Sequence, residues 1–104
     1  MVKGVLPLLV LQVLSHGPNY GYQILAELRQ RSNGVLDYND GALYPVLYQL
    51  ERDACVESYT ETVDGRARRF YRLTAKGRAE RVKTQAEWAR FSQGVGLILG
   101  ENPA

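Results

Sequence analysis

The chain has 104 residues and a mass of 11.7 kDa, with 45% hydrophobic and 23% charged residues and a formal net charge of +2. This size fits one small domain, and the composition is that of a soluble globular protein rather than a disordered one. A single cysteine, Cys55, and a single histidine, His16, exclude an internal disulfide and a zinc site made from several Cys and His ligands. The longest apolar run is about half of the ~20 residues that a membrane-spanning helix needs, and no secretory signal is recognisable. We therefore expect a cytoplasmic protein without a metal or cofactor.

The basic residues gather in one part of the chain. Eight of the 13 lysines and arginines lie between Arg66 and Lys83, where Glu80 is the only acidic residue. The remainder of the chain carries five basic and ten acidic residues. This segment is a candidate for contact with a polyanion, and a solvated basic face is the alternative interpretation.

The first half of the chain predicts two helices separated by a loop. Residues 4–15 are apolar on nearly every side, which is typical of a buried helix, and Pro7 is tolerated there only near the first turn. The segment HGPNYG is typical of a loop. A second, amphipathic helix is expected from about Tyr20 to Arg31.

A third helix is expected from the capping residues Asn39 and Asp40 to about Asp53. Helical spacing predicts one buried stripe, made of Leu43, Val46, Leu47 and Leu50. The opposite side carries Ala42, Tyr44, Tyr48, Gln49 and Arg52. Pro45 lies beyond the first turn, so we expect it to distort the start of this helix.

Residues 56–73 alternate in a way that predicts a β-hairpin. Asp64 and Gly65 are suited to a two-residue type I′ turn, which needs a positive φ at both positions. With such a turn Val63 faces Arg66. The other cross-strand pairs are then Glu61 with Arg68, Tyr59 with Phe70, and Glu57 with Arg72.

Thr74 is expected to cap a long final helix over residues 75–99. Trp88, Phe91, Val95 and Ile98 recur on it at alternating steps of three and four, which predicts a seam for another helix. The order of elements predicts a mostly α fold with a β-hairpin wing: a winged helix-turn-helix domain over residues 1–74 and a dimerisation helix over residues 75–104. A helix face fits the major groove of DNA, and a basic hairpin tip beside it reaches the neighbouring backbone or minor groove.

Four segments also carry a resemblance to a known family. They are LLVLQVLSHGPNYGYQI (8–24), GALYPVLYQLERD (41–53), GRARRFYRLTAKGR (65–78) and EWARF (87–91). In this order and spacing the sequence resembles the short PadR-type transcriptional regulators over nearly its whole length. It departs from their pattern at Ala54 and Cys55, where glycine and a larger apolar residue are usual.

The resemblance implies a homodimer held together by the first and last helices. It implies a repressor that binds double-stranded DNA at a palindrome-like operator and is released by a small aromatic effector. The alternative is a winged-helix module that binds another protein and has lost DNA binding. No acid, base or nucleophile constellation is recognisable, so we do not expect an enzyme.

The candidate DNA-binding residues fall into three groups. Tyr20 and Tyr22 are expected to contact phosphates at the start of the second helix, unless one of them packs inward. The recognition helix contributes Asp40, Ala42, Tyr44, Pro45, Tyr48 and Gln49. Gln49 could read a base edge or be simply solvated. Arg66 and Arg69 are the wing candidates, because Glu61 could occupy Arg68 across the strands.

A second candidate site joins the first and last helices. It consists of Val5, Leu8, Leu9, Trp88, Phe91 and Val95. These residues form a dimer core, or a dimer core that also offers an aromatic wall to a planar effector.

Overall fold

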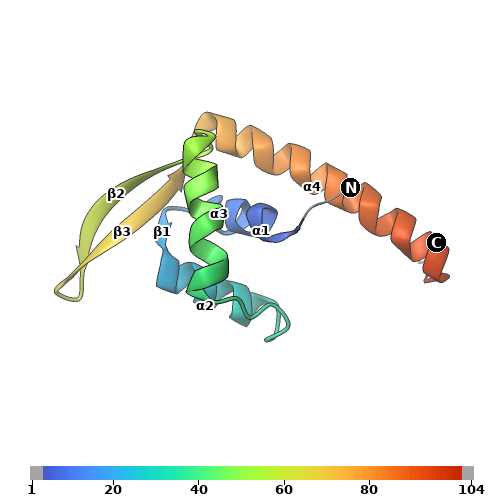
Figure 1. Cartoon of the computed structure of the whole chain (residues 1–104), viewed down its shortest axis with the longest axis horizontal. Coiled ribbons are helices and arrows are strands. Elements are labelled where there is room, and N and C mark those ends of the chain that lie inside the picture. The colour runs from blue at the N-terminus through green and yellow to red at the C-terminus, as the bar shows by residue number, and fades with distance from the viewer. Residues whose placement is uncertain (1–3, 102–104) are drawn as a thin grey trace.

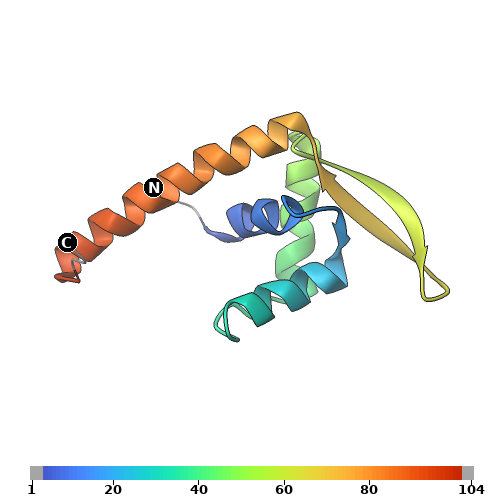
Figure 2. The ribbon, with the colours of Figure 1, turned by 180° about the vertical axis from the view of Figure 1, so that it is seen from behind.

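A computed structural model describes residues 4–101 of the chain. The elements of this part are α1 (Leu6–Leu14), β1 (Asn19–Tyr20), α2 (Gly21–Arg31), α3 (Asp40–Arg52), β2 (Val56–Val63), β3 (Arg66–Leu73) and α4 (Ala75–Leu99). In Figures 1 and 2 the hairpin of β2 and β3 and the second half of α4 project from the body in opposite directions. The longest dimension is 52 Å and the shortest 22 Å.

The core lies where α1, α2 and α3 meet the base of the hairpin. Val10, Ile24, Leu43 and Leu47 are completely buried there, and Tyr71 of β3 closes the core from the sheet side. The apolar sequence of α1 is thus explained, because this helix is covered by α2, α3 and α4. Pro7 occupies the first turn of α1, as predicted, where no helical N–H is required.

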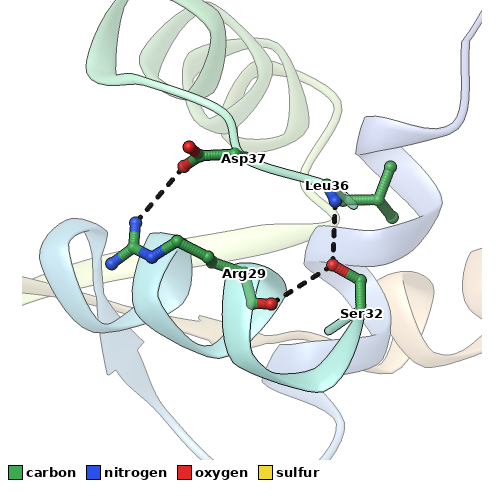
Figure 3. Close-up of polar contacts among 4 residues, drawn as sticks. All are labelled: Arg29, Ser32, Leu36 and Asp37. Carbon is green, nitrogen blue, oxygen red and sulfur yellow. Dashed lines mark hydrogen bonds and ion pairs between the residues drawn. The ribbon is translucent and has the colours of Figure 1, made fainter. Parts of the chain in front are cut away.

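The turn between α2 and α3 is held by side chains (Figure 3). The hydroxyl of Ser32 donates to the Arg29 carbonyl at 3.3 Å and accepts the Leu36 N–H at 2.8 Å. Arg29 also pairs with Asp37 at 3.4 Å. Both side chains of this ion pair are about half exposed, so the pair adds little stability. The hydrogen bonds of Ser32 therefore stabilise the turn more than the ion pair does.

Helix α3 begins and ends as the sequence predicts. Asn39 caps it by accepting the Ala42 N–H at 3.0 Å. The helix continues through Pro45 to Arg52 without a break, although the missing N–H of Pro45 leaves the Gly41 carbonyl without its helical donor. Beyond the helix, Ala54 has a φ of 61°, the left-handed conformation that usually takes glycine.

The predicted register of the hairpin is confirmed. Val63 pairs with Arg66 across a turn in which Asp64 and Gly65 both have positive φ, 52° and 77°. Arg72 and Glu57 form the predicted ion pair at 2.9 Å.

The prediction of a simple loop at HGPNYG is wrong. Asn19 and Tyr20 form β1 and pair with Tyr71 and Phe70, so the sheet has three strands in the order β1-β3-β2. Two residues are too few to show a β period in the sequence, and only the position of β3 beside them creates the strand.

Helix α4 starts at a tightly packed corner. The Thr74 hydroxyl accepts the Gly77 N–H at 3.0 Å and donates to the Ala54 carbonyl at 2.6 Å. A Cβ at Gly77 would overlap the Cys55 carbonyl, so this close approach of α4 to the end of α3 requires glycine. From this corner α4 runs past α1 and then beyond the body of the molecule (Figure 1).

Candidate nucleic-acid interface

Predicted DNA-contacting tyrosines gather where the start of α2 meets α3. Tyr20 occupies the N-cap position of α2 in an extended conformation and makes no side-chain capping bond, and Tyr22 lies in the first turn with 65% of its surface exposed. On α3, the rings of Tyr44 and Tyr48 lie 5.9 Å apart. Tyrosine hydroxyls commonly bind phosphate, and the free N–H groups at a helix start favour anions. This corner is therefore suited to a nucleic-acid backbone.

Tyr44 is not the outward-pointing side chain that helical spacing predicts. Its ring packs against the core, and its hydroxyl lies so close to Gly21 that a Cβ there would overlap it. Burial, together with the nearby Asp40 carboxylate, raises the pKa of Tyr44. Ala42, also predicted on the exposed side, is half-buried against the core as well. Both side chains are less exposed than predicted, because neighbouring elements cover the flanks of α3 as well as its central stripe.

The exposed surface of α3 is instead formed by Asp40, Pro45, Tyr48 and Gln49. The amide of Gln49 is already bonded: it donates to Asp53 at 3.0 Å and accepts from Arg52 at 2.7 Å. A contact between Gln49 and a base edge would exchange these exposed bonds for new ones. Arg52 at the end of α3 therefore belongs to the same polar surface, although the sequence assigned it no role.

The two predicted wing arginines lie on opposite faces of the hairpin. Side chains alternate along a strand, so Arg66 and Arg69 cannot share a face. Arg69 turns toward α3, where its guanidinium is 3.5 Å from the Glu51 carboxylate. The Ser58 hydroxyl donates to the same carboxylate at 2.7 Å. Glu51 thus links the recognition helix to the wing, and no local signal identifies it because its partners lie on the hairpin.

Arg68 does not form the cross-strand ion pair with Glu61 within residues 4–101; its guanidinium instead lies over the ring of Tyr20, 5.2 Å from the centroid. The ring centroids of Tyr20 and Phe70 are 5.1 Å apart, and Phe70 stacks on Tyr59 with the ring centroids 5.6 Å apart. This row of rings crosses all three strands. Tyr20 is consequently half-buried, and its ring holds the wing to the start of α2.

A hollow of about 810 Å³ lies between α1 and α4. Four of the six residues predicted for the second site line it, namely Val5, Leu8, Trp88 and Phe91. The rings of Trp88 and Phe91 are 5.9 Å apart. Leu9 does not line the hollow but packs against the core, and Val95 lies further along α4.

Within the part of the chain that the structure describes, no helix could span a membrane and no cluster of three metal-binding side chains occurs. Helices α2 and α3 are joined by a defined turn, and the three-stranded wing lies beside the exposed flank of α3. This arrangement defines a winged helix-turn-helix protein. The chain belongs to the Transcriptional regulator PadR-like family, whose model matches residues 10–83. It is therefore a member of a family of transcriptional regulators and not an enzyme.

Individual relatives agree with this assignment. Transcriptional regulator Rv3488 of Mycobacterium tuberculosis is 40% identical over 72 residues, which cover 66% of this chain and 64% of that protein. A PadR family transcriptional regulator from Eggerthella lenta has a similar structure, with a TM-score of 0.81 and 29% identity over 96% of this chain and 86% of its own. A transcriptional regulator from Clostridium thermocellum shares the fold, with a TM-score of 0.83 and 23% identity over 91% of this chain and 90% of its own.

Proposed function

We propose that this regulator is a homodimeric repressor that binds a palindrome-like operator in double-stranded DNA. Family membership supports DNA as the partner, and the exposed surface formed by α2, α3 and the wing supports the place of contact. The observation that carries the proposal is that two contacts hold the wing against α3 and against the start of α2. Arg69 pairs with Glu51 of α3, and the Arg68 guanidinium lies over the ring of Tyr20. In the proposed complex α3 enters the major groove and the wing contacts the backbone beside it.

The proposed contacts follow this geometry. Tyr22 and Tyr48 are the most open of the tyrosines, and we assign them phosphate or base-edge contacts. Tyr20 and Tyr44 contribute the exposed parts of half-buried rings at the edge of this surface. Asp40, Pro45 and Gln49 complete the surface of the recognition helix, with the half-buried Ala42 beside them. Arg66 at the wing tip and Arg69 at its α3 side contact phosphates.

We further propose that a small aromatic effector binds the hollow beside Trp88 and Phe91 and releases the DNA. Aromatic side chains that line a hollow together with polar groups are typical of small-molecule sites. The polar groups of this hollow are Glu80, Thr84, Glu87 and Arg90. Val5 and Leu8 complete the wall from α1. The exposed apolar residues further along α4 support its use as a dimerisation helix, so the same helix would carry both dimer contacts and effector contacts.

Gel shifts titrated with salt test the DNA proposal on the intergenic duplex upstream of the gene, with a scrambled duplex as competitor. Wild-type protein is expected to shift the intergenic duplex specifically and with a steep dependence on salt. Arg66→Ala is expected to weaken binding and to lower the log–log salt slope by about one, because one phosphate contact is lost.

Arg90→Ala is the matched control, because it removes the same charge about 22 Å along α4 from the start of that helix. It should leave the slope unchanged. An unaltered slope for Arg66→Ala would remove the wing tip from the interface. Absence of a shift on either duplex at low salt would instead favour a protein-binding module.

A further inference from the structure

A second, smaller hollow lies in the angle between α1, α3 and α4. Its volume is about 490 Å³, within the range of small-molecule sites. Leu11, Val46, Leu50 and Cys55 provide an apolar lining from the core side. Burial, and then the nearby Glu80 carboxylate, raises the pKa of the Cys55 thiol, which is therefore a neutral apolar group in this lining.

The rim of this hollow is charged. Asp53 and Glu80 contribute carboxylates and Lys76 contributes an ammonium group, so the rim carries a net negative charge. Glu80 is half-buried, yet its carboxylate makes no ion pair with any residue between positions 4 and 101. A carboxylate at the edge of an apolar surface pairs favourably with a cationic group.

The smaller hollow is distinct from the one beside Trp88. The two share Pro7, Leu8, Glu80 and Thr84, so they adjoin along α1 and α4. The aromatic pair of α4 lines only the larger hollow, whereas the lining contributed by α3 belongs only to the smaller one.

We propose that the smaller hollow binds an amphipathic cation, an amine attached to an aromatic or aliphatic body of about one ring. The body lies on Leu11, Val46 and Leu50, the ammonium group pairs with Glu80, and Asp53 adds a second carboxylate to the rim. The occupant is assigned from charge complementarity: an anion would meet two carboxylates and a single lysine, and a neutral molecule would leave Glu80 without a partner.

The position of this site gives it access to the recognition helix. Val46 and Tyr48 differ by about 200° around α3, so the hollow is at the back of the helix whose front carries Tyr48. Pro45 and Gln49, which belong to the proposed DNA surface, also line this hollow, so a ligand there reaches the edge of that surface. Binding of a ligand in this hollow is therefore measured in the absence of DNA.

Three probes with the same ring and different charge test the proposal on the full chain: 3-phenylpropylammonium, 3-phenylpropanol and 3-phenylpropanoate. Calorimetric titration without DNA is expected to give about tenfold tighter binding of the cation than of the alcohol, because one charge-assisted pair is gained. Methyl NMR signals of Val46 and Leu50 should shift on titration, while the indole N–H of Trp88 stays in place.

Glu80→Gln is expected to abolish the preference for the cation, and Glu80→Lys to transfer it to 3-phenylpropanoate. Glu87→Gln is the matched control, because Glu87 lies on the same helix but lines only the larger hollow. It should retain the preference. Equal binding of all three probes, no binding of any, or a shift of Trp88 without shifts of Val46 and Leu50 would overturn the proposal. Since no DNA is present, failure here is distinguishable from failure of the proposed operator binding.

Discussion

At the scale of single residues, Ala54 is the clearest departure from local preference. It has a φ of 61° at the end of α3, where the Ala54 N–H bonds to the Glu51 carbonyl and the Cys55 N–H bonds to the Leu50 carbonyl. These two bonds define a Schellman motif, in which the left-handed residue is usually glycine. Alanine holds this conformation at a cost of about 1 kcal/mol, because its Cβ crowds the following carbonyl.

Ala54→Gly is therefore expected to raise the free energy of unfolding by about 1 kcal/mol, and the melting temperature by roughly 4–8 °C for a domain of this size. Chemical denaturation and thermal melting measure both quantities. Ala79→Gly is the matched control, because Ala79 is exposed within α4 and the same substitution should destabilise by about 1 kcal/mol there. Destabilisation at both positions would show that the backbone at residue 54 is not strained.

Tyr71 places a hydroxyl group in the core. The residue is completely buried, and its oxygen has no hydrogen-bond partner in the described part of the chain. Burial raises the pKa of Tyr71 above its ordinary value, although the positive charge of Arg69 opposes this. The neutral phenol is thus the form compatible with the folded state.

Tyr71→Phe is expected to raise the free energy of unfolding at pH 7 by about 1 kcal/mol, because a buried unsatisfied hydroxyl is removed while the ring is kept. The pH dependence has a defined sign. The stability that comes from the raised pKa of Tyr71 is fully present below the unfolded tyrosine pKa of about 10, and it is lost as the pH rises through the higher folded pKa. The variant should lose less stability between pH 9 and 11 than the wild type, measured by urea denaturation. A lower stability of Tyr71→Phe at pH 7 would show that the hydroxyl is satisfied.

At the scale of elements, the features that local sequence controls were the ones predicted. Asn39, Thr74 and the Asp64-Gly65 turn set helix starts and a strand register through bonds to neighbouring residues, so their effect can be read along the chain. Strand β1 could not be predicted, because its two residues become a strand only beside β3.

The candidate site shows the same division. The sequence placed Trp88 and Phe91 together with Val5 and Leu8, because helical spacing puts the two aromatic residues on one face of α4 and the first helix was expected beside it. It failed for Tyr44 and Arg68, whose positions depend on Gly21 and Tyr20 of another element. The role of Glu51 was not predicted for the same reason, since its contacts with Ser58 and Arg69 join α3 to the hairpin. Residues that join two elements are thus those that a single sequence identifies least well.

At the scale of the whole molecule, the second half of α4 has no partner within the described chain that covers its apolar side chains. Ile98 is 89% exposed, and Leu97 and Leu99 are also largely open. Trp88, Phe91, Val95 and Ile98, all exposed, recur on one side of α4 at steps of three and four residues. The second half of this helix extends away from the body (Figure 2). Apolar surface of this extent on a helix that leaves its own domain is typical of an interface between subunits.

The proposed homodimer therefore depends on this half of α4. Replacing Val95 and Ile98 together by glutamate places two charges per subunit in the seam, and each buried aliphatic side chain contributes about 1.5–3 kcal/mol. We expect the dimer dissociation constant to rise by at least about 100-fold, measured by sedimentation equilibrium. Gln93→Glu, on the same helix and exposed, is the control and should remain dimeric.

Loss of the dimer has a consequence for DNA that a purely local defect would not have. A palindrome-like operator presents two half-sites, and a dimer binds both with the relative position that its interface imposes. The Val95→Glu/Ile98→Glu variant keeps α2, α3 and the wing, so it should retain weak, salt-dependent binding to any duplex while losing the specific shift on the operator. A monomeric wild type, or a monomeric variant that binds the operator as tightly as the wild type, would show that α4 does not set the spacing of the two recognition helices.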